Sequence, residues 1–169
     1  MAEEVASSGP QLFNSPLETG IRALAILDAA YPRAFDLSEL TWLDHLVVHT
    51  ADIDGPESLH PDLPHRTGEL LVRRHIIEDG LTLMRRQHLI EMQNDARGLL
   101  YKASDDGAAV LELVRTDYAR KLRDRARWLA DHIKSMSPDD LKALVDEKIG
   151  RWPIEFDHSG RSGSGTLNL

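Results

Sequence analysis

The sequence predicts a mainly α-helical fold with a small β-hairpin, in which a winged-helix-like core is followed by C-terminal helices. The main observation is a change of pattern after Gln87, where apolar residues at helical spacing give way to two short alternating runs, Leu89–Gln93 and Leu99–Lys102. Turn-forming residues, Asn94–Gly98, separate these runs. When the spacing of apolar residues changes from a period of 3.6 residues to a period of 2 residues before a turn, the pattern indicates a helix that leads into a hairpin. Gly80, inside this helix, costs about 1 kcal/mol relative to Ala, which predicts a break or close packing there.

Length and composition indicate one compact core. The chain has 169 residues, of which 41% are hydrophobic, and this suits a single core with short tails better than two full domains. We expect a disordered N-terminus over residues 1–11 and a winged-helix-like domain over residues 12–104. C-terminal helices packed on that domain should span residues 105–153, followed by a flexible tail over residues 154–169.

Composition also predicts a cytoplasmic protein without a membrane partner. The chain has no cysteine, which excludes disulfides and thiolate metal sites and fits a reducing compartment. No apolar run reaches the roughly 18 residues needed to cross a bilayer. The acidic N-terminus lacks the charged-then-apolar order of a secretory signal.

The net charge of −8 is unevenly distributed along the chain. Residues 1–65 contain 2 basic (Lys or Arg) and 11 acidic (Asp or Glu) residues. Residues 66–136 contain 14 basic and 11 acidic residues, and residues 137–169 contain 4 basic and 6 acidic residues. An acidic first half argues against a broad nucleic-acid footprint and leaves room for a local basic face. The simpler interpretation is a solvated surface with uneven charge.

Capping sequences predict where the helices begin. Ser15–Glu18 and Asp36–Glu39 have the capping-box pattern, in which the first side chain and the Glu side chain satisfy backbone amides at the helix start. Thr116 and Ser137 precede the last two predicted helices and can cap them. The first helix should end at Pro32.

A long segment, residues 50–66, separates the second and third predicted helices and contains three prolines. It exceeds the usual connection length, so we expect it either to pack over the core or to serve in binding. It is too long for the turn of a helix-turn-helix motif, which counts against a standard DNA reader.

Two histidines raise the question of a metal site. His45 and His49 have the i, i+4 spacing of a two-histidine ligand pair. Further acidic and histidine residues follow at Asp52, Asp54, His60 and His65. No third ligand has a fixed spacing, and the general-base Glu of an H-E-x-x-H motif is missing. We therefore expect these histidines to cap, stack or hydrogen-bond, with a metal-dependent enzyme as a minor alternative, and we predict no metal or cofactor.

Sequence signatures of common catalytic sites are also missing. The chain has no Gly-rich phosphate loop, no nucleophile elbow and no paired-carboxylate signature. Folding could still bring separate polar residues together into a catalytic site, but no sequence pattern points to one. We therefore expect no catalytic activity.

The predicted helix from Asp117 to about Ser135 has two distinct faces. Residues at steps of three and four form an apolar stripe, namely Tyr118, Leu122, Ala126, Leu129, Ile133 and Met136. A second face carries Lys121, Arg125, Trp128 and His132. Since Trp and Arg dominate binding hot spots, this face is a candidate partner site. Alternatively, Trp128 packs against a neighbouring helix.

Three blocks of sequence together resemble a known family. They are LFNSPLETGIR (residues 12–22), GPESLHP (residues 55–61) and PHRTGELLVRR (residues 64–74). The combination resembles the middle-component family of bacterial ABC-three-component systems, closest to the small middle subunit of Lamassu anti-phage systems, from about Leu12 to Ile133. The resemblance implies a non-catalytic winged-helix accessory subunit of an SMC-like ABC ATPase. Such a subunit would couple DNA sensing by the ATPase to a nuclease-type effector in defence against phages or plasmids.

Several of the residues that carry the resemblance are caps and turn residues, so the match reflects fold more than function. They are Phe13, Asn14, Ser15, Pro16, Glu18, Asp36, Leu37, His49, Gly55, Pro56, Ser58, Leu59, His60, Pro61, Pro64, Arg66, Gly68, Glu69, Leu70, Arg73 and Arg74. The chain departs from the family pattern at His88, where a glycine is expected before the first strand. It also departs at Asp52–Asp54, in the approach to the long loop.

We predict two groups of contact residues. Contacts with the ATPase and effector subunits are expected from Arg73, Arg74, His60, Lys121, Arg125 and Trp128. Phosphate contacts, to DNA held by the complex, are expected from Arg85, Arg86, His88 and the wing-tip Arg97, which should cluster where a winged helix touches DNA. Four cations beside an acidic half would give only weak, salt-sensitive affinity. The alternative function is a free-standing winged-helix transcription regulator that binds DNA by itself.

Overall fold

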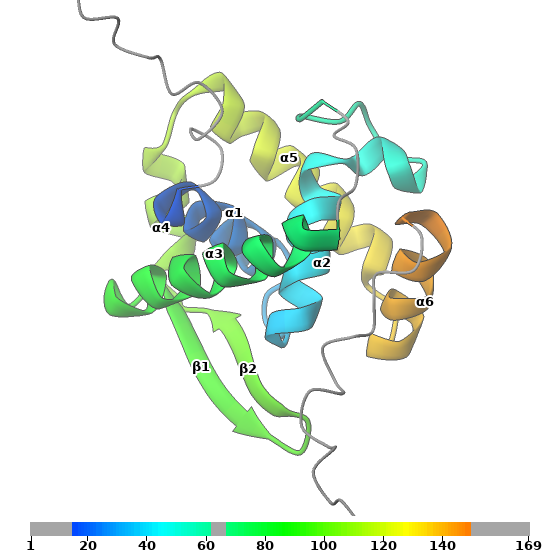
Figure 1. Cartoon of the computed structure of the whole chain (residues 1–169). Helices are drawn as coiled ribbons and strands as arrows, with labels where there is room; N and C mark the ends of the chain where they lie inside the picture. The colour runs from blue at the N-terminus through cyan, green and yellow to red at the C-terminus, as the bar shows by residue number, and fades with distance from the viewer. Residues whose placement is uncertain (1–14, 62–66, 150–169) are drawn as a thin grey trace, which may run out of the picture.

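The computed structural model describes residues 15–61 and 67–149, and it shows helices gathered around one core with a hairpin that projects from them (Figure 1). The elements in chain order are α1 Pro16–Ala29, α2 Leu37–Val48, the 3₁₀ turn η2 Thr50–Ile53, α3 Thr67–Arg86, β1 Ile90–Asp95, β2 Gly98–Ala103, α4 Gly107–Leu113, α5 Asp117–Ile133 and α6 Pro138–Ile149. The predicted mainly α fold with a small hairpin is confirmed. Within these two ranges, no helix has the length and apolar character needed to cross a membrane.

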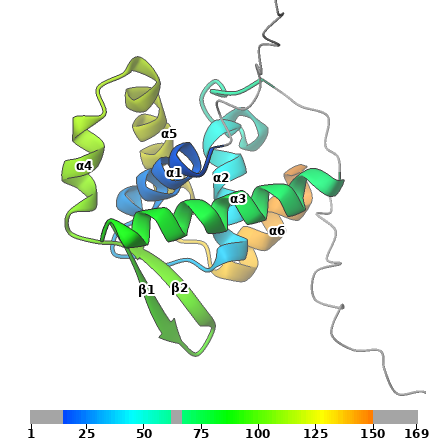
Figure 2. The same cartoon turned by 60° about the vertical axis from the view of Figure 1, so that its left-hand side comes forward.

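Helix α1 is the centre of the bundle. It packs against α2, α3, α4 and α5, with α3 in front of it and α5 behind it in Figures 1 and 2. Its residues Ala23–Leu27 are all buried, because a helix covered on several sides keeps no apolar residue in contact with water. The core continues into α2, where Leu43, Leu46 and Val47 are fully enclosed.

The predicted helix starts are confirmed at Ser15, Asp36 and Thr116. The Asp36–Glu39 capping box is complete, since the Glu39 amide donates to Asp36 Oδ1 and the Asp36 amide donates to Glu39 Oε2, each at 2.8 Å. At α1 one half of the box is seen: the Glu18 amide donates to Ser15 Oγ at 3.2 Å, while Glu18 Oε2 is buried and has no hydrogen-bond partner among the described residues.

Helices α1 and α3 cross where two glycines meet. A Cβ atom built on Gly80 would lie 2.7 Å from the Gly20 nitrogen and 3.0 Å from the Pro16 oxygen. Both are backbone atoms and have no rotamer through which to move away. The close packing expected at Gly80 is therefore confirmed, and α3 continues through it without a break.

The hairpin follows α3 as predicted. Strands β1 and β2 are antiparallel, and Met92 lies opposite Tyr101. Tyr101 also forms a single bridge on its other side, because its amide donates to the Phe35 carbonyl at 2.8 Å and the Phe35 amide donates to the Tyr101 carbonyl at 3.0 Å. The bridge ties the hairpin to the connection between α1 and α2.

The turn of the hairpin is shorter than predicted. The strands extend to the pair Asp95 and Gly98, so Ala96 and Arg97 alone form the turn. Ala-Arg lacks the Asn-Gly or Asp-Gly signal of a two-residue turn, which is why the sequence favoured a longer one. Two local features replace that signal: Asp95 Oδ1 accepts the Arg97 amide at 2.6 Å, and Gly98 has a positive φ of 108° that glycine adopts readily.

Helix α3 ends in a Schellman motif centred on His88. His88 has a φ of 58°, its amide donates to the Arg85 carbonyl, and the Leu89 amide donates to the Met84 carbonyl, both at 3.0 Å. This left-handed position normally holds glycine, which is also the residue that the resemblance led us to expect before the first strand. The histidine is accommodated there, exposed to solvent.

The C-terminal helices pack on the bundle. The predicted stripe of α5 is buried at Leu122, Ala126, Leu129 and Ile133, and α5 ends at Ile133 rather than near Ser135. In the short helix α4, Leu111 is buried whereas Leu113 is 75% exposed.

Several sequence predictions lie outside the residues that the structure describes. They are the disorder of residues 1–11, the flexible tail over 154–169, and the contribution of Phe13, Asn14, Pro64 and Arg66 to the family resemblance.

Candidate functional site

A buried charge cluster joins α1, α2 and α3, and we call Arg22, Asp44 and Arg73 the Asp44 cluster. Arg22 Nε lies 2.8 Å from Asp44 Oδ1, and Arg73 Nη1 lies 2.8 Å from Asp44 Oδ2. Arg22 and Asp44 are only 3% and 1% exposed. Arg22 also donates to Thr19 Oγ1 at 3.3 Å. One carboxylate thus holds two guanidinium groups from different helices.

The electrostatics of the Asp44 cluster favour its charged form. Burial alone would raise the pKa of Asp44, but the attraction and hydrogen bonds of Arg22 and Arg73 outweigh burial and lower the pKa. Burial opposes the charge on Arg22 as well, and Asp44 more than compensates, so the pKa of Arg22 is raised. The cluster therefore remains ionised in the folded chain.

A row of aromatic and histidine side chains lies next to this cluster. The rings of His45 and His49 are 4.4 Å apart, and His49 meets His60 edge-on at 6.2 Å. His60 Nε2 lies 2.7 Å from the Tyr118 hydroxyl, and His45 Nε2 lies 3.3 Å from Asp52 Oδ2. Burial, followed by repulsion from Arg22 and His49, lowers the pKa of His60 to about 4.

The side chains of this row form hydrogen bonds and ring contacts with one another, as expected. Among the residues that the structure describes, no group of three or more His, Asp or Glu side chains is placed to hold a metal ion. His45 lies in the last turn of α2 and His49 caps the end of that helix, and their rings are tilted by 32° relative to each other.

The second face of α5 holds the first part of the long loop against the core. Arg125 Nε donates to the Glu57 carbonyl at 2.9 Å. A Cβ atom on Gly55 would lie 2.5 Å from Cη2 of Trp128, so this indole packs directly on the glycine. Trp128 also stacks on His132, with ring centroids 4.8 Å apart. Of the two roles expected for the loop, packing over the core is confirmed for residues 50–61.

Five of the six residues predicted to bind partners make contacts within the chain. Arg73 belongs to the Asp44 cluster, His60 bonds Tyr118, and Arg74 donates to Ser38 Oγ at 3.0 Å. Arg125 and Trp128 hold the loop, as described above. Lys121 is exposed on α5. The partner-binding roles of all six residues stay predictions.

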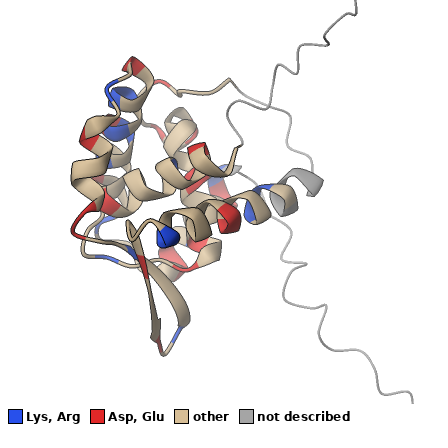
Figure 3. Cartoon of the chain, turned by 90° about the vertical axis from the view of Figure 1, so that its left-hand side faces the viewer, with Lys and Arg blue, Asp and Glu red and all other residues tan. Residues whose placement is uncertain are grey.

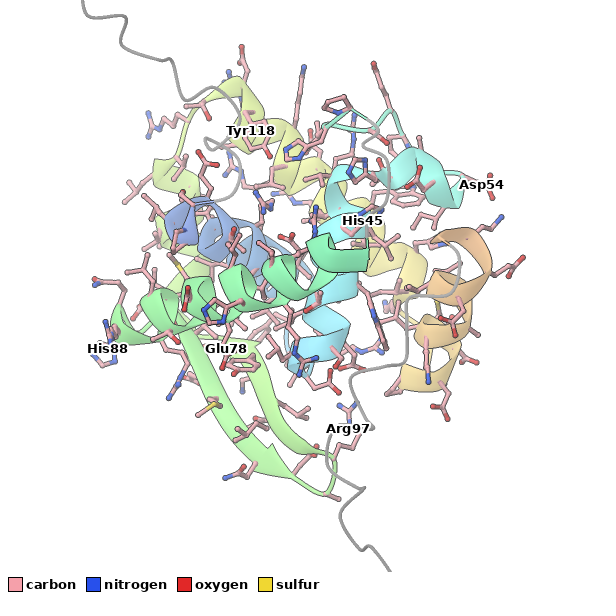
Figure 4. The ribbon with its side chains drawn as sticks, in the orientation of Figure 1. His45, Asp54, Glu78, His88, Arg97 and Tyr118 are labelled. Carbon is pink, nitrogen blue, oxygen red and sulfur yellow. The ribbon has the colours of Figure 1, made fainter. Side chains whose placement is uncertain are left out.

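The structure does not bring the four predicted phosphate-binding residues together. Arg85, Arg86 and His88 are exposed at the end of α3, whereas Arg97 lies at the far tip of the hairpin, as Figure 4 shows for His88 and Arg97. Arg97 Nη1 is also 3.3 Å from Glu39 Oε1, at the start of α2. Their separation follows from the length of β1, because an extended strand carries its tip well away from the helix that precedes it.

The family model for the ABC-three component (ABC-3C) system Middle Component 2 matches residues 12–155, which include every element of the fold. The chain belongs to this family. It is therefore a middle component, a defence-type accessory subunit that works with the other components of such a system. Comparisons of this middle component with curated proteins and with solved structures gave no match.

The Asp44 cluster of this middle component was not predicted from its sequence. A signal was available: Arg22 interrupts a run of apolar residues in α1, and Asp44 lies between Leu40 and Val48 on α2. An ionisable residue within an apolar stripe must be paired when the stripe is buried. The identity of the pair depends on how the helices cross, which the spacing within each helix does not specify.

Proposed function

We propose that this middle component is a non-catalytic subunit that bridges an SMC-like ABC ATPase, which senses DNA, and a nuclease-type effector in bacterial defence against phages or plasmids. The observation that carries the proposal is the family match over the entire folded region. Several polar residues of the interior support it, because Arg22, Asp44 and Arg73 form ion pairs and His60 both bonds and stacks on Tyr118. A Lamassu-type system is the setting that the sequence blocks favour.

The winged-helix interpretation belongs to the same proposal. The chain order is a helix, a single bridge at Phe35, two helices and a hairpin, which supports a winged-helix-like core. DNA contact would be made within the assembly through Arg85, Arg86 and His88, because these exposed side chains share one end of α3. A few cations at one helix end supply weak, salt-sensitive affinity alone.

Co-expression tests the proposal. The chain carrying an affinity tag is produced together with the products of the genes adjacent to its own, and a large ATPase with long heptad repeats is expected to co-purify. The substitution Lys121→Glu on α5 should weaken this association without loss of folding, because the side chain is exposed. Lys142→Glu, on the exposed side of α6, is the matched control and should have no effect. If no ATPase subunit co-purified with the tagged chain, the proposal would be contradicted.

The alternative, a free-standing transcription regulator, makes a different prediction. The isolated chain would then bind a specific DNA sequence at moderate salt, and a gel shift with the purified protein would detect it. The absence of a shift even at low salt would remove this alternative and leave the accessory role unchanged.

A further inference from the structure

The outer edge of β1 offers backbone groups for hydrogen bonding. Tyr101 exchanges both of its backbone hydrogen bonds with Phe35, on the side of β2 that faces away from β1. In an antiparallel pair of strands, two directly opposite residues either both point their N–H and C=O groups toward the partner strand or both point them away from it. Met92 lies opposite Tyr101, so the N–H and C=O of Met92 point outward from β1, and those of Asn94 do the same.

This edge is open in the part of the chain that the structure describes. The sheet there has only two strands, and β1 pairs with β2 alone. Residues 91–95 are exposed, and Figures 1 and 2 show the hairpin extending away from the helices, with β1 along its outer side. An exposed edge with outward backbone groups is a template for strand addition.

Side chains on β1 define what a new strand would meet. Met92 and Leu99 share one face of the hairpin, and they are 37% and 49% exposed. The opposite face of β1 carries Glu91 and Asp95, and β1 has no Lys or Arg. Of the two cations on the hairpin, Arg97 pairs with Glu39, and Lys102 lies over the Tyr31 ring at 5.9 Å.

We infer that the β1 edge binds an extended segment of another subunit of the system, in which apolar and basic residues alternate. The apolar residues would pack beside Met92, and the basic residues would lie beside Glu91 and Asp95, where opposite charges on neighbouring strands attract. The inference rests on the proposed function, because it requires that the chain works within an assembly. It also assigns the hairpin to protein contact.

Two other occupants fit the edge less well. A second copy of the chain would bring the carboxylates Glu91 and Asp95 of both β1 strands onto one short ribbon, without a cation on either strand. A nucleic-acid backbone would meet a hairpin whose outer strand carries only negative charge, as the sparse blue in this region of Figure 3 shows.

Hydrogen exchange of the wild-type chain tests the inference at residue resolution. In the free chain, the amides of Glu91 and Gln93 face β2 and should exchange slowly, while those of Met92 and Asn94 should exchange fast. In the co-purified complex, all four should be slow, with the exchange of Met92 and Asn94 reduced by about tenfold or more. Protection of Met92 and Asn94 in the free monomer, or only in a dimer of the free chain, would overturn the inference because the edge would already be occupied.

A proline substitution provides the second test. Met92→Pro removes the outward N–H and leaves the ladder to β2 intact, since the Met92 amide does not take part in that ladder. We expect association with the complex to weaken by about tenfold, whereas the matched control Met92→Ala, which keeps the amide, should weaken it by about threefold or less. Thermal melting of each variant reports whether the hairpin still folds.

The outcomes separate this inference from the proposed function. If the subunits co-purify but the fast amides stay fast in the complex, the accessory role holds and the inference about β1 is wrong. If no ATPase or effector subunit co-purifies, the proposed function itself is wrong.

Discussion

At the scale of single residues, the interior depends on one carboxylate. Asp44 accepts hydrogen bonds from Arg22 and Arg73 and lies almost fully out of contact with water. Removal of one partner from a buried ion pair costs far more than the pair contributes when intact, because the other charge is left without compensation. The stability of the bundle should therefore be sensitive to this position.

The first prediction concerns Asp44→Asn. This change keeps the size of the side chain and removes its charge, so Arg22 is left buried with a neutral partner. We expect the free energy of unfolding to fall by about 3 kcal/mol, measured by urea unfolding at pH 7. Glu112→Gln, at an exposed position on α4, is the control. A loss for Asp44→Asn no larger than that of the control would show that the ion pair has little importance.

The second prediction concerns pH and His60. The unfolded chain takes up a proton at this residue near pH 6.5, whereas the folded chain does so only near pH 4. Since the unfolded state then binds more protons between these values, stability should fall as the pH is lowered from 6.5 to 4. His60→Gln removes this contribution, so unfolding measured at several pH values should show a flatter dependence for the variant.

The wild-type chain is the control for this experiment, because other groups with shifted pKa values are present in both the wild type and His60→Gln. Burial raises the pKa of Glu39 and of Asp28, and both groups act in the opposite direction, because their ionisation disfavours the folded state as the pH rises. The difference between wild type and variant isolates His60 from them. An unchanged slope in His60→Gln would contradict the prediction.

At the scale of elements, the crossing of α1 and α3 depends on the absence of side chains. Gly20 and Gly80 let two backbones approach within a distance that any Cβ atom would prevent. Glycine in a helix is otherwise unfavourable, by about 1 kcal/mol relative to Ala. Close packing compensates for this intrinsic cost.

The third prediction follows from this competition. Gly80→Ala gains helix propensity but inserts a Cβ against backbone atoms, and overpacking of this kind costs about 1–3 kcal/mol. We expect a net loss of about 1–2 kcal/mol in the free energy of unfolding. Asp79→Ala, one residue earlier on the exposed side of α3, should be neutral or slightly stabilising in the same thermal or urea experiment. Stabilisation by Gly80→Ala would show that the helices separate at little cost.

The elements also show what sequence could and could not predict. The starts of α1, α2 and α5 were correct because a cap and its target amide are three residues apart, so the signal is local. The hairpin turn was placed too broadly, because Ala96 and Arg97 carry no turn signal of their own. The packing of Trp128 on Gly55 was missed, because it joins residues far apart in the chain, and helical spacing identifies only which residues share a face.

At the scale of the whole molecule, folding brings acidic residues of the first part of the sequence next to basic residues of the rest. Carboxylates of the acidic first part pair with cations from the rest of the chain: Asp44 with Arg73, Glu39 with Arg97, and Asp54 with Lys148. The charge asymmetry in the sequence is thus partly used for contacts within the fold. Figure 3 shows the result, with acidic and basic residues interspersed over the helices.

The fourth prediction concerns DNA binding by the assembled complex. Arg85 and Arg86 are exposed, so the double substitution Arg85→Ala and Arg86→Ala should leave folding unchanged. If both contact phosphates, the slope of log affinity against log salt should decrease by about 2, as measured by fluorescence anisotropy with labelled duplex DNA. Lys134→Ala together with Lys142→Ala removes the same charge from other exposed sites and should leave the slope unchanged. Equal slopes for both double variants would remove the proposed contact.

The junction between α3 and the hairpin has a mechanical consequence. Only Gln87–Leu89 separate the helix from β1, and the amides of His88 and Leu89, together with the Leu89 carbonyl, are all hydrogen-bonded. We therefore expect α3 and the hairpin to move together as one rigid unit. A force applied at the tip of the hairpin would then exert a torque on α3. The contact between Gly80 of α3 and Gly20 of α1 would resist that torque, so the force would be transmitted to the centre of the bundle.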